Sequence, residues 1–197
     1  MQTEAGFPSP SPARVRRGLI ELAMVSLVLV GAQAASAQEA HVVGDPEVRA
    51  RIGEAVRAIY DGVDGWGFAL TRDDVLGLDG AHGTQLQGGR VNGHLQRLLA
   101  TAWTEDGTYG AEFYLIGDTL LHVYEAFEYF PERAPPDAWV NFKGLPSWER
   151  RTYFEDGEVG YAEVKGNGAV PGADGPSLEA RARRVLAQLR VSAEERE

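Results

Sequence analysis

Residues 90–164 alternate between apolar and polar side chains, and short turn signals divide this stretch into segments of strand length. Asp-Gly pairs occur at Asp106 and Asp156, and Gly117-Asp118 lies between them. Such short connections join antiparallel strands, because parallel strands need a crossover of a dozen or more residues. We expect the glycine of each Asp-Gly pair to supply a positive φ. The stretch therefore predicts an antiparallel meander. Its strands are expected near 90–95, 97–104, 108–116, 119–130, 150–155 and 158–164.

Two amphipathic helices are predicted on either side of this meander. Asp45 suits the N-cap of the first helix and Pro46 suits its first turn. Apolar residues then recur at helical spacing from Val48 to Tyr60, and Gly62 ends the helix. Ser177 is expected to cap the second helix, which runs to 190. The predicted fold class is α+β, an antiparallel β-meander of about five to six strands packed with an N-terminal and a C-terminal helix.

Two segments are expected to leave this regular pattern. Residues 61–90 contain eight glycines, which favours loops or a flexible flap. Within them, Trp66–Leu70 is either a short buried strand or an anchor to the core, and Thr71–Leu76 has the pattern of a short helix capped by Thr71. Residues 131–148 contain four prolines, which oppose regular strand pairing.

The N-terminal residues have the pattern of an export signal. Arg14, Arg16 and Arg17 precede an apolar run over Leu22–Val30, and Ala35-Ser36-Ala37 supplies a cleavage site. We therefore expect a signal peptide at 1–37, one α+β domain at 38–190 and a disordered tail at 191–197. The chain is then periplasmic or secreted from a bacterium, with no membrane span after cleavage. The alternative is an uncleaved N-terminal anchor.

The composition excludes several classes of function. The chain has 197 residues, 29 acidic against 19 basic, a formal charge of −10 and no cysteine. The acidic balance argues against nucleic-acid binding, which needs a basic surface to neutralise phosphates. Without cysteine there is no disulfide framework, no thiolate metal site and no cysteine nucleophile.

No catalytic, cofactor or metal site is predicted from sequence motifs. The chain has no H-x-x-x-H pair, phosphate-binding glycine loop or G-x-S-x-G elbow. A metal site of His82, His94 and an Asp, or acid–base chemistry by facing strand carboxylates such as Glu112 and Glu125, stays an alternative without specific spacing. As a ligand or partner surface we expect residues of the predicted strands. They are His94, Tyr114, His122 and Tyr124.

The strand pattern resembles small uncharacterised secreted bacterial proteins in which a helix precedes an antiparallel meander. The residues that carry the resemblance are Gly88–His94, Leu98–Thr104 and Arg151–Val159, within about 70 residues of sheet. The resemblance implies a location in the cell envelope and no known activity. Residues 131–148, with their prolines, depart from a simple meander.

Two classes of function remain from the sequence. The first is a non-catalytic periplasmic module that binds a small ligand or another protein through its sheet or its glycine-rich segment. The second is a small hydrolase that uses carboxylates or a histidine in a sheet cavity. A deep pocket with two or more of His82, His94, His122, Glu112 and Glu125 favours the enzyme. An exposed apolar surface favours binding.

Overall fold

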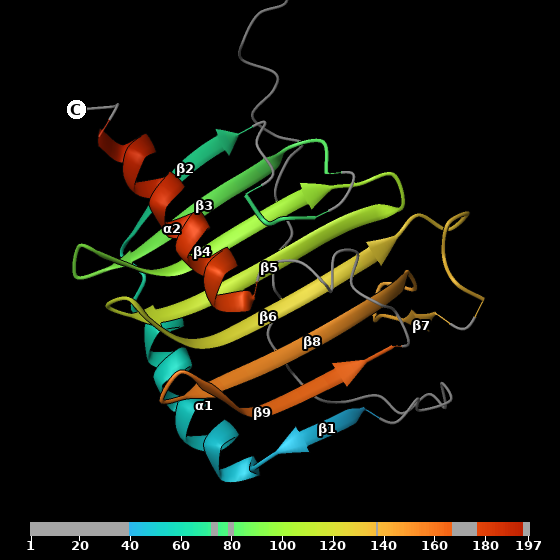
Figure 1. Ribbon diagram of the computed structural model, residues 1–197, viewed down its shortest axis with the longest axis horizontal. Helices are drawn as coiled ribbons and strands as arrows, with labels where there is room; N and C mark the ends of the chain where they lie inside the picture. Colours follow the sequence, from blue (N-terminus) through green and yellow to red (C-terminus); the bar gives the residue numbers. More distant parts are fainter. Residues whose placement is uncertain (1–39, 72–74, 79–80, 137, 167–176, 195–197) are drawn as a thin grey trace, which may run out of the picture. The chain divides into compact units, whose positions relative to one another are not determined.

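Nine strands of one antiparallel sheet organise the part of the chain that the computed structural model describes, residues 40–71, 75–78, 81–136, 138–166 and 177–194 (Figure 1). The strand order is β1-β9-β8-β6-β5-β4-β3-β2, and β7 pairs with β8 off this path. The strands are β1 (His41–Gly44), β2 (Gly65–Thr71), β3 (Thr84–Val91), β4 (His94–Trp103), β5 (Gly107–Ile116), β6 (Thr119–Tyr129), β7 (Trp139–Val140), β8 (Pro146–Glu155) and β9 (Glu158–Lys165). The helices are α1 (Pro46–Asp61) and α2 (Leu178–Glu194).

The predicted α+β class and antiparallel pairing are confirmed, whereas the predicted number of strands, five to six, is too low. All described residues belong to one compact unit, Ala37–Glu197. The predicted leader at 1–37 lies outside the described residues. Helix α2 continues to Glu194, so the predicted tail at 191–197 begins too early, and its last three residues lie outside the described part.

Two tight turns use left-handed backbone, as expected for antiparallel hairpins. Asp156 and Gly157 have φ values of 52° and 83° and connect β8 to β9, as predicted. Asn92 and Gly93 have φ values of 52° and 80° and connect β3 to β4. The predicted strand at 90–95 is therefore wrong, because this Asn-Gly turn ends one strand and begins the next.

Gly107 is required for a reason different from the predicted positive φ. A Cβ atom at this position would lie 2.2 Å from the backbone oxygen of Glu128 on the neighbouring strand β6. The turn before it is held by Thr104, whose hydroxyl oxygen accepts hydrogen bonds from the backbone N–H groups of Asp106 and Gly107, each at 3.2 Å. Glycine therefore permits a close approach of two strands here.

Much of the glycine-rich segment forms sheet instead of the predicted loops. The strand that was one of two predictions for Trp66–Leu70 is confirmed as part of β2, although Trp66 and Phe68 are exposed and not buried. Strands β2 and β3 pair along Gly65–Thr71 and Thr84–Arg90. At Gly88 a Cβ atom would lie 2.6 Å from Leu95 Cδ2 and 3.2 Å from Leu189 Cδ1, so the missing side chain makes room for α2. The predicted short helix at Thr71–Leu76 falls partly on residues 72–74, outside the described residues, while Val75 and Leu76 are buried in the core.

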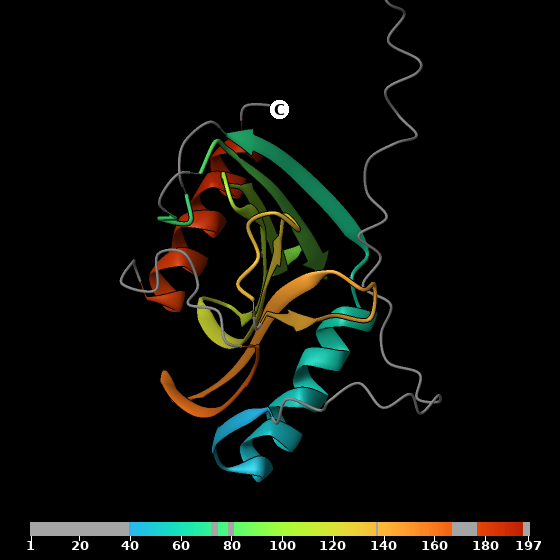
Figure 2. The same cartoon turned by 90° about the vertical axis from the view of Figure 1, so that its right-hand side faces the viewer.

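The two helices lie on opposite faces of the sheet (Figure 2). The α2 helix, capped by Ser177 as predicted, buries Ala182, Val185, Leu186 and Leu189 in the main apolar core. The α1 helix begins at the predicted cap Asp45, whose carboxylate accepts from the Glu47 N–H at 2.8 Å. Its residues Val48 and Ile52 pack on Tyr153 and Tyr161 from the other face.

A buried polar network fastens α2 to the middle of the sheet. The side chain of Glu125 is fully buried and accepts a hydrogen bond of 2.6 Å from the Tyr109 hydroxyl. Arg150 donates to the second carboxylate oxygen at 2.6 Å, and Arg181 of α2 lies 3.4 Å from the first. A carboxylate buried on an apolar face needs such partners, so this network fixes where the helix sits.

Candidate functional site

The open face is our name for the side of the sheet opposite α2, where it is not covered by α1. Helix α1 crosses the sheet from β9 to β4 close to the turns at Asn92-Gly93, Gly117-Asp118 and Asp156-Gly157 (Figure 1). Side chains of the remaining rows on this face are mostly half-buried. Among the described residues no helix covers them, so this is where a ligand has access to the sheet.

A buried ion pair lies at the boundary between α1 and the open face. Arg97 of β4 pairs with Glu112 of β5, and the hydroxyl of Tyr114 donates to the same carboxylate oxygen at 2.5 Å. The Arg97 guanidinium also lies 4.2 Å from the ring centroid of Tyr60 on α1 and 5.3 Å from that of Trp66 on β2. The cluster joins α1, β2, β4 and β5, and leaves little of Glu112 exposed.

Burial sets the protonation of this cluster. It raises the pKa of the Glu112 carboxyl, while the charge of Arg97 and the hydrogen bonds from Tyr114 and Arg97 act in the opposite direction. Burial also raises the pKa of Tyr114, and the neighbouring Glu112 carboxylate adds to this shift. Tyr114 therefore stays protonated at neutral pH, and its hydroxyl donates its hydrogen bond to the Glu112 carboxylate.

His122 lies beside this cluster in the row of residues beneath α1. Its ring lies 4.3 Å from that of Tyr153 and 5.7 Å from that of Tyr114, measured between centroids. Its Nδ1 lies 2.9 Å from the carbonyl oxygen of Thr152, which can only accept, so Nδ1 carries the proton. Burial lowers the pKa of His122 to about 4, so the imidazole is neutral at neutral pH.

The β8–β9 side of the open face is charged. The guanidinium of Arg151 lies 5.2 Å from the ring centroid of Tyr124, 3.5 Å from Glu149 and 3.9 Å from Glu163. Lys165 lies 3.7 Å from Glu163. Burial and the nearby Glu149 carboxylate raise the pKa of Tyr124. Opposite charges balance one another here, so this side carries no strong excess of either sign.

Apart from the buried Arg97, the β2–β4 side of the open face is uncharged and aromatic. Trp66, Phe68 and Trp103 are exposed by 43%, 47% and 39%. The register places Phe68, Gln87 and Leu99 in one row across β2, β3 and β4, and Gln85 and Thr101 in the next row. We call this surface the aromatic platform. Its residues are Trp66, Phe68, Gln85, Gln87, Leu99, Thr101 and Trp103.

The structure brings together three of the four residues expected from the sequence. Tyr114, His122 and Tyr124 occupy positions on the face of the sheet opposite α2, although Tyr114 and His122 are buried beneath α1. His94 is exposed at the start of β4, beside the Asn92-Gly93 turn. Sequence analysis missed the aromatic platform, and the alternation of Trp66 and Phe68 was the signal for it.

The other residues considered for chemistry are dispersed. His82 is exposed, and Glu125 faces α2 on the opposite side of the sheet from Glu112. Within the described ranges no three His, Asp or Glu side chains gather in a way that could hold a metal ion. None of the described helices is long and apolar enough to cross a membrane.

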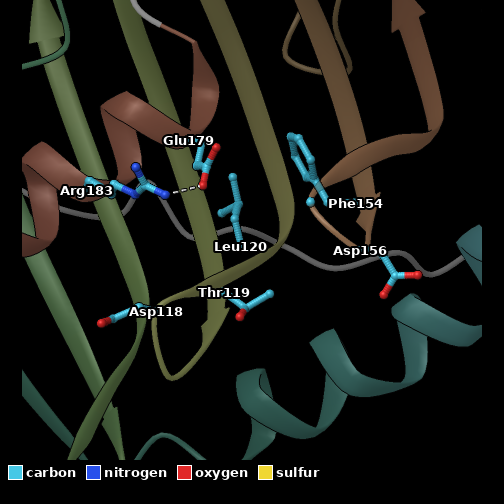
Figure 3. A pocket seen from close by; sticks show the side chains of 8 residues that line it. Asp118, Thr119, Leu120, Phe154, Asp156, Glu179 and Arg183 are labelled. Carbon is cyan, nitrogen blue, oxygen red and sulfur yellow. Dashed lines mark hydrogen bonds and ion pairs between the residues drawn. The ribbon is translucent and has the colours of Figure 1, made fainter.

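A hollow lies where the first turn of α2 meets the β5–β6 and β8–β9 turns (Figure 3). Its volume is about 420 Å³. Leu120 and Phe154 are its buried apolar residues, and Glu179 pairs with Arg183 at 2.5 Å along its side. That ion pair is exposed, so it adds little binding energy in water. It is lined by Asp118, Thr119, Leu120, Phe154, Asp156, Gly157, Glu179 and Arg183.

Comparison of the chain with protein-family models, with curated proteins and with solved structures finds no match. The resemblance to small secreted bacterial proteins therefore stays a prediction. Any functional conclusion has to come from the geometry of the sheet.

Proposed function

We propose that this chain is exported from a bacterial cell and acts as a non-catalytic binding module, which holds a ligand or another protein against the open face of its sheet. The observation that carries the proposal is the aromatic platform. A folded protein rarely leaves several large aromatic side chains exposed on one side of a sheet without a binding role. Aromatic residues are also enriched at binding surfaces.

The polar groups near α1 support binding over chemistry. Glu112 and His122 both have shifted pKa values, which is the pattern that favours a hydrolase. Each is already occupied, because Glu112 accepts from Arg97 and Tyr114, and His122 donates to Thr152. Both side chains are buried, His122 beneath α1 and Glu112 at the boundary between α1 and the open face. The alternative of a hydrolase that uses these two residues therefore has weaker support.

Export is the part of the proposal that depends on the sequence alone. The basic cluster, the apolar run and Ala37 support a cleaved leader. Expression of the full chain in a bacterium, followed by mass measurement of the protein from the periplasm, tests this directly. A product that begins at or near Gln38 is expected. A full-length product that stays in the membrane fraction contradicts cleavage.

Binding is tested by purifying the processed protein from envelope extract and identifying co-purified proteins and small molecules by mass spectrometry. The test compares the wild type with the double variant Trp66→Ala, Phe68→Ala. Phe142→Ala is the matched control, because Phe142 is 80% exposed and does not belong to the aromatic platform. We expect bound material that the double variant loses and the control retains. Bound material unaffected by the double variant contradicts the proposed surface.

A further inference from the structure

We infer that the aromatic platform binds a neutral oligosaccharide. This inference rests on the proposed function and names the chemistry of the ligand. It depends on three properties of the β2–β4 side of the open face, namely the absence of charge, the presentation of the aromatic rings and the free hydrogen-bonding groups between them.

The platform contains no ionisable side chain, although 24% of the residues in the chain are charged. The nearest ion pair, Arg97–Glu112, is buried and satisfied. A ligand with a carboxylate, phosphate or ammonium group would lose hydration here without gaining an opposite charge. The surface therefore favours a ligand without net charge.

The ring of Trp66 rests on the sheet and does not stand up from it. A Cβ atom at Gly89 of β3 would lie 3.3 Å from Trp66 Cη2, so the missing side chain leaves space for the indole. Arg97 projects from the same face of the sheet, and its guanidinium lies over the same ring, 5.3 Å from the centroid. The indole is thus held against Gly89 and Arg97 while 43% of the residue stays exposed. A supported, solvent-facing ring is suited to stacking against the C–H face of a pyranose.

The spacing of the three aromatic residues fits an extended ligand. Trp66 and Phe68 are two residues apart on β2, about 7 Å between Cα atoms. Trp103 lies two strands away and four residues further along the register, at about 16 Å from Phe68. A chain of several sugar units can contact all three, whereas a single sugar reaches only one or two.

The polar residues of the platform can recognise hydroxyl groups. Gln85, Gln87 and Thr101 lie between the aromatic residues, and amide and hydroxyl groups both donate and accept hydrogen bonds. No side-chain hydrogen bond joins these three to another residue of the described ranges. An acyl chain would leave these groups without partners, and a sugar would satisfy them.

The test uses saturation-transfer NMR and titration calorimetry on the processed protein. The probes are β-1,4-linked glucose tetramer, N-acetylglucosamine tetramer and mannose tetramer, with tetragalacturonate as an anionic comparison and phosphatidylcholine vesicles as an apolar one. We expect at least one neutral tetramer to bind with Kd in the micromolar to millimolar range, on the order of 4–8 kcal/mol. Tetragalacturonate is expected to bind at least tenfold more weakly.

Single substitutions identify the residues that bind the oligosaccharide. Trp66→Ala and Phe68→Ala should each weaken binding at least tenfold, and Phe142→Ala should leave it unchanged. Thr101→Val keeps the shape of the side chain, so it preserves the fold and should still weaken binding severalfold. Circular dichroism confirms that each variant is folded.

Two results overturn the inference. One is the absence of binding by every neutral tetramer at 10 mM, a concentration above the roughly millimolar weak limit of the expected range. The other is binding that the platform variants leave unchanged. If these variants instead lose vesicle binding or a captured envelope protein, the open face binds a different class of ligand. In that case the proposed function stands and the oligosaccharide inference fails.

Discussion

Acid should destabilise this protein partly through His122. Burial lowers the pKa of this imidazole from an ordinary 6.5 to about 4 in the folded state. Between these values the unfolded chain binds a proton that the folded chain does not, so stability is lost as the pH falls from 6.5 to 4. A difference of about 2.5 units at 1.36 kcal/mol each gives a loss of about 3 kcal/mol from this one residue.

The measurement is urea denaturation at several pH values between 7 and 4, for the wild type and His122→Phe. Phenylalanine keeps a ring between Tyr114 and Tyr153 but leaves the Thr152 carbonyl without its donor, at a cost of about 1–3 kcal/mol at pH 7. The variant should then lose about 3 kcal/mol less than the wild type as the pH falls. His94→Gln, which replaces an exposed histidine, should behave as the wild type. Equal pH dependence in the wild type and His122→Phe refutes the argument.

Two further substitutions test the sheet itself. Glu125→Gln removes the carboxylate that two arginines face, and should lower the free energy of unfolding by about 3–5 kcal/mol in a urea melt. Arg150→Ala should cost less, and an equal cost would contradict the assigned role of the carboxylate. Gly107→Ala places a methyl group against the backbone oxygen of Glu128 and should cost about 1–3 kcal/mol. Gly110→Ala, where a Cβ atom meets nothing within 4 Å, is its control, and a similar loss in both variants would show that the close approach is not the cause.

The predictable part of the fold is the part that local chemistry decides. Asp45, Ser177 and the Asp156-Gly157 turn each act through neighbouring backbone groups, and all three have the predicted role. Gly88 and Gly107 act through distant partners, Leu189 and Glu128. A sequence pattern shows that such a position is glycine but not which surface approaches it. The pattern of the glycine-rich segment therefore predicts loops.

The candidate site was predictable only in outline. Of the residues expected at a binding surface, Tyr114 and Tyr124 lie on the same face of the sheet. Which part of that face stays open depends on where α1 crosses it, and this depends on the packing of Val48 against Tyr153 and Tyr161. The exposure of Trp66 follows from β2 being the terminal strand on that side, which is a property of the complete sheet.

The pairing of β1 with β9 constrains the order in which the strands of the sheet can form. His41 lies opposite Val164, so the strand at the start of the described chain completes its hydrogen bonds only with one near the end. Pairing over such a sequence separation is slow, because a long loop must close before any contact forms. If the chain crosses a membrane N-terminus first, β1 and α1 arrive well before the strands they pack on. The edge of the sheet formed by β1 and β9 then stays incomplete until β9 has emerged.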